Sequence, residues 1–293
     1  MPRFQVDRSE KVLDFLKRRL PGWKTPTLKQ RLKNGLVLRD GAPILSGAET
    51  LRAGETVEVL AIPPSPAAHL PIGLGEPPLT VLYADDSLLA VDKPSGLLSV
   101  ATEREKNITA IRLMREWLLG MERESGRDLH AAHRLDREAS GVLLLARSLE
   151  IKRKLASAWR SYEKIYLAVV DGVPDQRSGT IDVPLWEDKG LFVRAGDKGR
   201  GEAALTQYRV VKKVRGRALL EVRLGTGRKH QIRVHLAHLG CPIVGDLRYG
   251  VSKASRLALH AHRLCLFHPV DGRAMEITAP IPSQFKKMLS GKS

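Results

Sequence analysis

A single carboxylate lies between two arginines in the segment His-Arg-Leu-Asp-Arg-Glu-Ala-Ser-Gly at residues 133–141. The flanking cations, Arg134 and Arg137, favour the ionised form of Asp136. An ionised carboxylate suits a nucleophile or a charge stabiliser better than it suits a general acid. The apolar run at 142–146 predicts a buried strand, which would hold Asp136 on a rigid support. The alternative is an ordinary surface ion pair, the more common outcome for an isolated Arg-x-Asp sequence.

A tyrosine lies within the apolar run at residues 163–170. If this run forms a strand, Ile165 and Leu167 point to one face and Tyr166 points to the other. Tyr166 is therefore a candidate to face a functional site. Taken alone, an ordinary half-buried strand tyrosine is the more common interpretation.

A third segment, Gly-Arg-Lys-His-Gln-Ile-Arg-Val-His at residues 227–235, places a glycine at the start of a predicted helix rich in hydrogen-bond donors. Such a helix start favours an anion, for example a phosphate or a carboxylate. Arg233 shares a face with His230, off the apolar stripe of that helix, although a surface arginine is the alternative. His235 and His238 lack cysteine or carboxylate partners at metal-ligand spacing, so we expect helix packing and no metal site.

The charge of the chain indicates a polyanionic partner. The 293 residues carry a formal net charge of +17, which favours nucleic acid through long-range attraction and counterion release. No apolar run approaches the roughly 20 residues that cross a bilayer, so we expect no membrane partner. Residues 1–7 lack the apolar core of a secretory signal. Cys241 and Cys265 form no Cys-x-x-Cys pair, and we expect reduced thiols in a cytoplasmic protein.

Prolines and glycines concentrate in residues 61–78. Proline blocks helix and removes backbone donors, so this stretch reads as an extended, semi-rigid linker. We therefore place a first domain at 1–62, a linker at 63–78 and a second domain at 79–293.

In the first domain, apolar spacing predicts a small α/β fold of two helices and three short strands. The helices are expected at 9–20 and 27–34, and the strands at 36–38, 42–44 and 56–60. Ser9 is the expected cap of the first helix, and Gly35 is the expected cap of the second. On the second helix, we expect two inward residues and three outward ones, respectively Leu28 and Leu32, and Lys29, Arg31 and Lys33.

The second domain alternates helices with many hairpins, which indicates an α+β fold with a mixed, mostly antiparallel central sheet and flanking helices. We expect strands at 79–83, 88–92, 164–170, 203–213, 218–224, 257–267 and 274–279. We expect helices at 107–121, from the cap Ser148 onward, and at 227–240.

The three segments together resemble the RluA-type family of pseudouridine synthases. The family signature His-Arg-Leu-Asp-x-x-Thr-Ser-Gly is matched at 133–141 with Ala139 in place of Thr, and the strand tyrosine is matched at Tyr166. The family segment Gly-Arg-x-His-Gln-Ile-Arg-x-His is matched at 227–235. Further matches are Asp-Lys-Pro-Ser-Gly-Leu at 92–97, Gly-Cys-Pro-Ile-Val-Gly-Asp-x-x-Tyr at 240–249 and Leu-His-Ala at 259–261. The resemblance covers residues 79–282 and implies the pseudouridine synthase fold.

By this resemblance, Asp136 is the catalytic aspartate and acts at the anomeric carbon of a target uridine, whose base detaches, rotates and rejoins through carbon five. Arg233 would pair with Asp136. Tyr166 would pack against the base and is a candidate general base. The implied substrate-binding residues are Arg134, which would occupy the space that the flipped base leaves, Arg228 and His230. The resemblance implies neither a metal nor an organic cofactor.

The first domain resembles the small RNA-binding domain named after ribosomal protein S-four. Its pattern is matched by Asn-Gly-Leu-Val-Leu-Arg-Asp-Gly at 34–41 and by Leu-Arg-Ala-Gly-Glu-Thr-Val-Glu-Val at 51–59. Two positions depart from the pattern, since Asp40 replaces the usual Asn and Glu55 the usual Asp. The resemblance implies that this domain binds RNA.

We therefore expect a monomeric RNA pseudouridine synthase that acts on structured RNA, with large-subunit ribosomal RNA favoured over tRNA. A non-catalytic RNA-binding or ribosome-assembly factor is an alternative, but it has no need of Asp136, Tyr166 and Arg233 together. A nucleoside or glycoside hydrolase is another, and it would need a second carboxylate as its acid.

Overall fold

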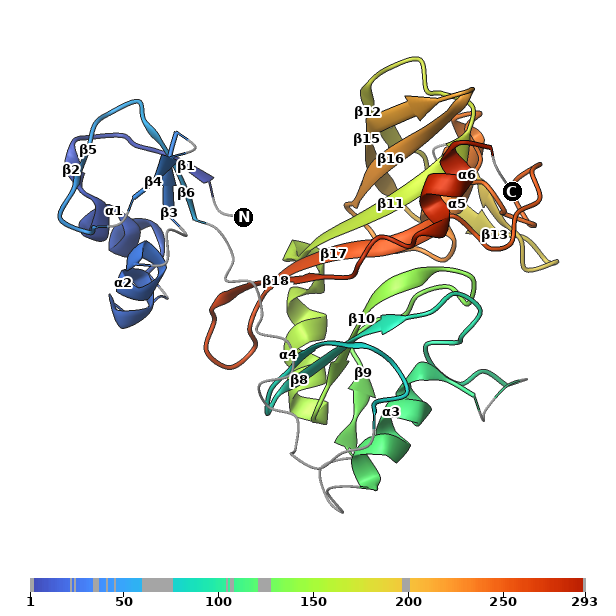
Figure 1. Cartoon of the computed structure of the whole chain (residues 1–293), viewed down its shortest axis with the longest axis horizontal. Helices are drawn as coiled ribbons and strands as arrows, with labels where there is room; N and C mark the ends of the chain where they lie inside the picture. Colours follow the sequence, from blue (N-terminus) through green and yellow to red (C-terminus); the bar gives the residue numbers. More distant parts are fainter. Residues whose placement is uncertain are drawn as a thin grey trace. The chain divides into compact units, whose positions relative to one another are not determined.

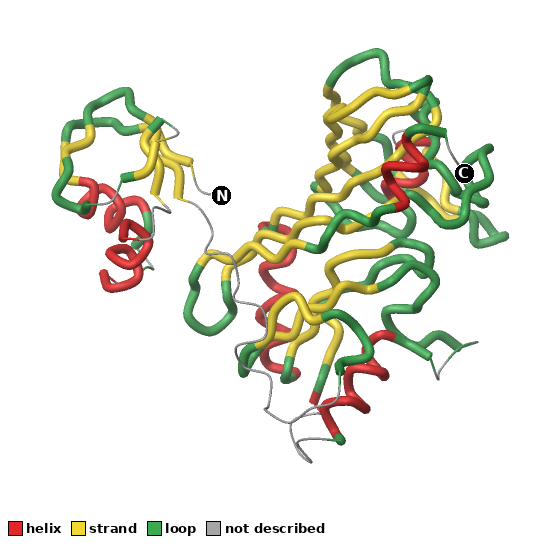
Figure 2. Tube along the Cα trace, in the orientation of Figure 1, coloured by secondary structure: helices red, strands yellow, loops and turns green. Residues whose placement is uncertain are grey.

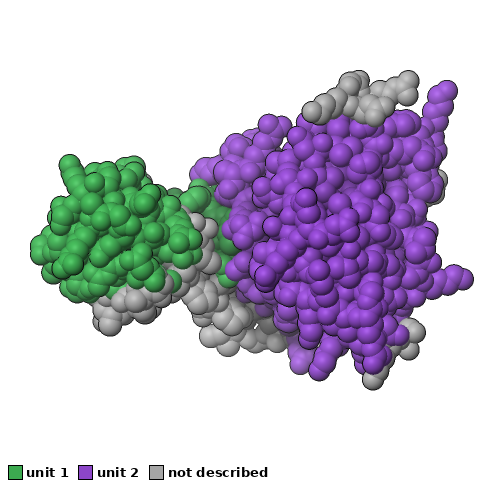
Figure 3. All heavy atoms as spheres, turned by 90° about the horizontal axis from the view of Figure 1, so that it is seen from above, with its two compact units in different colours: residues 1–64, 265–276 green, residues 65–264, 277–293 purple. Residues whose placement is uncertain are grey.

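The computed structural model describes residues 3–21, 23, 25–33, 37–40, 42–44, 46–59, 76–103, 105, 108–120, 128–196 and 201–291 (Figures 1 and 2). The chain forms two compact units (Figure 3). The first contains residues 1–64 together with 265–276, and the second contains 65–264 and 277–293. The segment 265–276 was not expected in the first unit, because it is far away in the sequence.

The first unit has a four-stranded sheet, two helices and a separate two-stranded pair. The sheet has the order β1-β6-β3-β4, from Arg3–Gln5, Thr56–Val59, Val37–Arg39 and Ala42–Pro43. The pair joins β2 (Glu10–Lys11) to β5 (Thr50–Leu51), and the helices are α1 (Val12–Arg19) and α2 (Thr25–Lys33). Its core is formed by Val6, Val12, Phe15, Leu16, Leu20, Leu28, Leu32, Val37, Ile44, Leu51, Val57 and Val59.

The outward position predicted for Arg31 is wrong. Arg31 is completely buried, donates a hydrogen bond of 3.0 Å to the carbonyl of Ala274, and lies 4.4 Å from the ring centroid of Trp23. The segment 265–276 supplies that carbonyl, so a distant part of the chain satisfies the guanidinium. The neighbouring Lys29 is exposed, as predicted.

The cap predicted at Ser9 is also wrong. Helix α1 begins after Lys11 and has no side-chain cap, while the Ser9 hydroxyl donates to the carbonyl of Leu51 at 3.0 Å. Leu28 and Leu32 are buried, as predicted. Gly35 and the side chain of Lys33 lie outside the described residues.

The second unit is built on a large, mostly antiparallel sheet, which confirms the predicted α+β class (Figure 1). The strand order is β12-β15-β16-β11-β17-β10-β8-β7, with β18 paired to β17 and β9 to β10. These strands are β7 (Val81–Ala84), β8 (Leu88–Lys93), β9 (His130–Ala131), β10 (Ser140–Ala146), β11 (Glu163–Asp171), β12 (Ser178–Asp182), β15 (Leu205–Val214), β16 (Arg217–Leu224), β17 (Leu259–Phe267) and β18 (Ala274–Thr278). A small hairpin joins β13 (Leu185–Glu187) to β14 (Val193–Ala195).

Strand β10 is the rigid support that the apolar run predicted. Every residue of β10 is buried, because the strand lies inside the sheet, antiparallel to β8 and parallel to β17. Gly141 has a φ of 110°, and a Cβ there would lie 2.2 Å from the carbonyl oxygen of Ala261. Only glycine therefore permits this approach of β10 to β17. The site segment 132–139 leads directly into this strand.

The helices of the second unit are α3 (Ala110–Leu119), α4 (Leu149–Ala158), α5 (Gln231–His238) and α6 (Gln284–Leu289), with a short 3₁₀ turn, η2, at Trp159–Ser161. Ser148 caps α4 as predicted, since its hydroxyl accepts a 3.1 Å hydrogen bond from the Ile151 N–H. The predicted helix at 227–240 begins later, at Gln231, because His230 adopts a left-handed conformation with a φ of 53°. No helix among the described residues is long and apolar enough to cross a membrane.

Candidate active site

Asp136 lies on the segment between β9 and β10, and residues 93–99 brace that segment. The ammonium group of Lys93, which has no exposed surface, donates to the carbonyls of Leu97 at 2.7 Å and Arg137 at 3.3 Å. The Ser99 hydroxyl binds both backbone groups of Leu135, at 2.9 and 3.0 Å. Burial lowers the pKa of Lys93 to about 8. These contacts hold the backbone on both sides of Asp136.

Helix α5 carries Arg233 to the carboxylate of Asp136. The guanidinium is only 4% exposed, and its Nη1 donates to Asp136 Oδ2 at 3.3 Å and to Glu138 Oε2 at 3.4 Å. Burial by itself lowers the pKa of Arg233, but the hydrogen bonds and charge of Asp246, with the charge of Asp136, raise it overall. Arg233 is therefore a permanent cation beside Asp136. The predicted pairing of these residues is present in the structure.

Asp246 is the partner that sequence reasoning missed. Its buried carboxylate accepts two parallel hydrogen bonds from Arg233, each of 2.8 Å. It also accepts the backbone N–H groups of Arg248 at 2.9 Å and Tyr249 at 3.1 Å. Such bidentate pairing fixes both the position and the plane of a guanidinium. The available signal was the Gly-Asp-x-x-Tyr pattern, to which no role had been attached.

Tyr249 is a second residue that was missed, and it supports both basic residues of the site. Its ring centroid lies 5.3 Å from Arg233 Cζ. Its hydroxyl lies 2.8 Å from His230 Nδ1 and accepts the backbone N–H of Val193 at 3.2 Å. Because His230 Nε2 lies 4.0 Å from Asp136 Oδ2, Tyr249 holds the imidazole near the carboxylate. Burial lowers the pKa of His230, against the raising effect of Asp136.

Tyr166 faces Asp136 from strand β11. Its neighbours Ile165 and Leu167 are buried on the opposite face of the strand, so the predicted alternation holds. Burial, followed by the negative charge of Asp136, raises the pKa of Tyr166. The phenol therefore stays neutral beside the carboxylate.

A cavity of about 90 Å³ brings all six predicted site residues together: Arg134, Asp136, Tyr166, Arg228, His230 and Arg233. Arg134 is exposed at this cavity. Arg228 donates to the carbonyl of Ala203 at 3.2 Å and pairs with Glu202 at 2.5 Å. The volume is smaller than that of an engineered cavity of about 150 Å³ that holds benzene.

Helix α5 has no side-chain cap, and the loop that leads into it is held by Gln231. The side-chain oxygen of Gln231 accepts the Arg228 N–H at 2.9 Å and the Thr226 hydroxyl at 2.8 Å. His235 is completely buried and lies 2.8 Å from the Thr206 hydroxyl, in keeping with the predicted packing role. Within the described ranges, no group of His, Cys, Asp or Glu side chains has the arrangement of a metal site.

Residues 87–238 match the RNA pseudouridylate synthase family. The chain belongs to this family. A curated relative, ribosomal large subunit pseudouridine synthase D of Xanthomonas campestris pv. campestris, is 34% identical over 98% of this chain and 88% of its own length. The same-named protein of Xylella fastidiosa is 31% identical over 98% of this chain and 88% of its own length.

The solved structures agree with the sequence relatives. Human RNA pseudouridylate synthase domain containing 4 aligns with a TM-score of 0.61 and 26% identity, over 72% of this chain and 92% of its own. Human RNA pseudouridylate synthase domain containing 1 has the same fold, with a TM-score of 0.58 and 23% identity over 75% of this chain and 90% of its own. The chain is thus an RNA pseudouridine synthase of the RluA type, an isomerase whose substrate is RNA.

Proposed function

We propose that the enzyme converts specific uridines of large-subunit ribosomal RNA to pseudouridine, with Asp136 as the nucleophile. The observation that carries this proposal is the Asp246–Arg233–Asp136 chain of ion pairs, which places Asp136 in a cavity that Tyr166 also lines. The choice of ribosomal RNA rests on relatives named ribosomal large subunit pseudouridine synthase D. The net charge of +17 agrees with an RNA substrate.

Asp136 would attack or stabilise the anomeric carbon of the target uridine as its bond to nitrogen breaks. The chemistry parallels retaining glycoside cleavage, in which a carboxylate meets an oxocarbenium-like centre. The released base rotates, and carbon five bonds to the anomeric carbon as any bond from that carbon to Asp136 breaks. Carbon five then loses its proton, and the nitrogen that left the sugar takes one up. Because water would hydrolyse the sugar instead, the base must remain in a closed cavity during the rotation.

Arg233 supplies a fixed positive charge to Asp136 throughout this sequence. Its other edge is bound by Asp246, so it neither rotates away nor loses its charge. A preorganised partner of this kind costs no rearrangement at the moment of reaction. We assign Arg233 to orienting Asp136 and balancing its charge.

Tyr166 would pack its neutral phenol against the target base. A general base must lose its proton before it accepts another, and the raised pKa of Tyr166 opposes this. The packing role is therefore favoured over proton abstraction for this residue.

The other cavity residues would bind the displaced nucleotide. A uridine within folded RNA must be flipped out at a cost of a few kcal/mol, and exposed Arg134 is placed to fill the space that it leaves. Arg228 and His230 would contact the flipped nucleotide from the opposite wall. The first unit, by its resemblance to the S-four domain, would add RNA contacts, and we propose that the enzyme acts as a monomer.

The test is to incubate purified enzyme with transcribed large-subunit ribosomal RNA and with tRNA, and to map pseudouridine in each. We expect new pseudouridine at defined positions of the ribosomal RNA, and at least a thousandfold loss of rate for Asp136→Asn. Modification of tRNA alone would replace the substrate assignment. An Asp136→Asn variant as active as the wild type would refute the catalytic assignment, and release of free uracil would indicate a hydrolase.

A further inference from the structure

A second, larger cavity of about 790 Å³ adjoins the one that holds Asp136. His230 and Arg233 line both cavities. The two cavities therefore lie on either side of these two residues, next to the position proposed for the target nucleotide. The volume of the larger cavity exceeds what a single base requires, and the proposed reaction has no use for it.

An exposed aromatic ring stands at this cavity. Phe192 precedes strand β14 and is 39% exposed. Arg248 Cζ lies 4.1 Å from its ring centroid, and the ring of Tyr249 meets it edge-on at 6.0 Å. These contacts hold the ring in place while part of it remains accessible. A fixed, accessible ring is the feature on which nucleic-acid bases stack.

The lining of the cavity also carries excess positive charge. Arg233 is neutralised by carboxylates, but Arg248 and Arg256 form no ion pair with any described residue. Arg248 donates to the carbonyl of Leu191, and its buried Nε has no hydrogen-bond partner in the described part of the chain. The acidic residue of the lining, Glu138, faces Arg233 at 3.4 Å. Arg248 is thus left to attract an anion, while the charge of Asp92 partly offsets that of Arg256.

We propose that this cavity binds a nucleotide that neighbours the target uridine, with its base on Phe192 and its phosphate at Arg248 and Arg256. The inference rests on the proposed function, because it takes the flipped uridine to occupy the adjoining cavity. The ring and the cations match the two parts of a nucleotide. The subsite would therefore make the enzyme sensitive to the residue beside its target.

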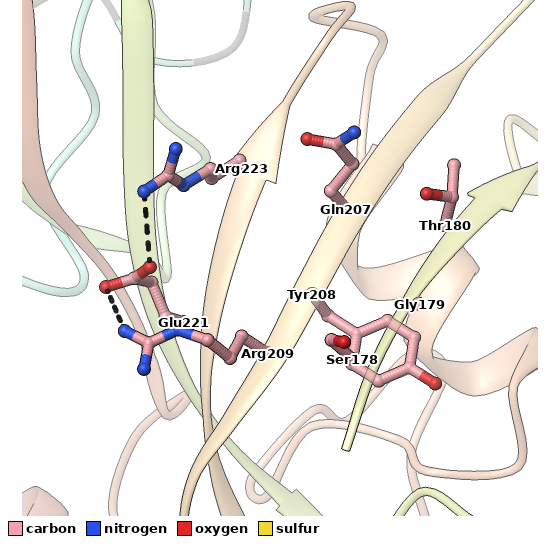
Figure 4. Close-up of a pocket in the computed structure, with 8 residues that line it drawn as sticks. All are labelled: Ser178, Gly179, Thr180, Gln207, Tyr208, Arg209, Glu221 and Arg223. Atoms are coloured by element: carbon pink, nitrogen blue, oxygen red, sulfur yellow. Dashed lines mark hydrogen bonds and ion pairs between the residues drawn. The ribbon is translucent and has the colours of Figure 1, made fainter. Parts of the chain in front are cut away.

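A third cavity, of about 350 Å³, shows the contrast (Figure 4). There Glu221 lies between Arg209 and Arg223, at 3.2 and 3.7 Å, and Arg223 also pairs with Glu163 at 2.6 Å, so each arginine has a carboxylate partner. Strand alternation also directs Arg209 and Glu221 to the face opposite Tyr166. Among the described residues, this cavity shares no lining residue with the one that holds Asp136 and both of its arginines are paired, so Arg209 serves as a matched control for Arg248.

The test uses stem-loop RNAs that carry the mapped target uridine. In the intact RNA both neighbouring nucleotides are present, and in each abasic RNA one of these neighbours lacks its base. Turnover is followed by tritium release from carbon five of uridine. We expect Phe192→Leu and Arg248→Gln to raise KM by about fivefold to a hundredfold, the range typical of one stacked base, with little change in kcat. Arg209→Gln and Val211→Ala, a change at a 48% exposed position of β15, should match the wild type.

The deciding result is non-additivity. If Phe192 stacks on the neighbouring base, removal of that base should raise KM for the wild type and leave Phe192→Leu almost unchanged. An equal effect of Phe192→Leu on intact and abasic RNA would overturn the subsite, as would a KM equal to that of the wild type. Melting temperatures of all variants separate this result from loss of folding.

A binding measurement keeps the subsite distinct from the reaction. The affinity of Asp136→Asn protein for the same RNA, with and without Phe192→Leu, requires no turnover. If the wild type forms no pseudouridine, the reaction is refuted. The subsite still stands in that case if Phe192→Leu weakens binding to the intact RNA and does not weaken binding to the abasic RNA. Equal affinities would refute the subsite whatever the reaction.

Discussion

Replacement of Asp246 should expose how the enzyme holds its arginine. The carboxylate of Asp246 is 1% exposed and accepts four hydrogen bonds, two of them from Arg233 at 2.8 Å. Asp246→Leu leaves a guanidinium that is 4% exposed without its bidentate partner. Removal of one member of a buried ion pair costs about 3–5 kcal/mol. This loss lowers the melting temperature by roughly 10 °C in a domain of this size.

Asp246→Leu should lower kcat by more than its loss of folding stability explains. Arg233 Nη1 lies 3.3 Å from Asp136 Oδ2, and Asp246 binds the opposite edge of the guanidinium through two hydrogen bonds. A misplacement of about 1 Å at a reacting group can cost about a hundredfold in rate. We expect a fall of that size in kcat, measured by tritium release at a temperature where the variant is fully folded.

The double variant Arg233→Met/Asp246→Leu separates the two effects. Apolar side chains of similar volume often replace a buried pair at no cost, so its free energy of unfolding in urea should rise above that of Asp246→Leu. It should stay below that of the wild type, because the N–H groups of Arg248 and Tyr249 still lack their acceptor. Its activity should stay low, because Asp136 then lacks the guanidinium that lies 3.3 Å from it. The reasoning is refuted if the double variant regains activity, or if Asp246→Leu costs no more than Glu116→Gln, which breaks the exposed pair with Arg112.

Three further predictions concern stability. Burial lowers the pKa of Lys93 in the folded chain to about 8, against 10.5 for the ordinary side chain. The free energy of unfolding should therefore rise by up to about 3 kcal/mol from pH 8 to 10.5. Urea titrations should show this rise in the wild type and not in Lys93→Met. Burial lowers the pKa of His133 and of His260 from 6.5 to about 4. The free energy of unfolding should therefore fall as the pH drops from 6.5 to 4, by up to about 3 kcal/mol for each histidine. A His133→Gln variant whose stability falls as much as that of the wild type over this pH range would contradict the prediction. Gly141→Ala should reduce soluble expression or melting temperature sharply, since the new Cβ meets the Ala261 carbonyl oxygen at 2.2 Å; Gly216→Ala, at a position with a φ of 78° and open space, is the milder control.

Local patterns predicted the elements that carry the site. The apolar run after Asp136 predicted the buried strand β10, since a strand inside a covered sheet buries both of its faces and so has apolar residues at successive positions. Alternation along β11 placed Tyr166 on the site face. The cap at Ser148 was predicted because a hydroxyl that satisfies a helix N–H is a contact between near neighbours.

Contacts between distant segments were not predictable in the same way. The Asp246 carboxylate reaches Arg233 across a loop that has no period, and Ala274 covers Arg31 from the far end of the chain. The left-handed His230, which delays the start of α5, is likewise set by its surroundings.

The sequence by itself determined which residues have the chemistry of this enzyme and on which strands and helices they lie, because residue type and periodicity are local properties. The tertiary structure alone decided how Asp136 is held. Asp246 binds the far edge of the Arg233 guanidinium that pairs with Asp136, and Lys93 donates a hydrogen bond to the backbone carbonyl of Arg137, the next residue in the chain. Both are contacts between segments that meet only when the sheet has formed, when burial makes the correct partners far more stable than any others.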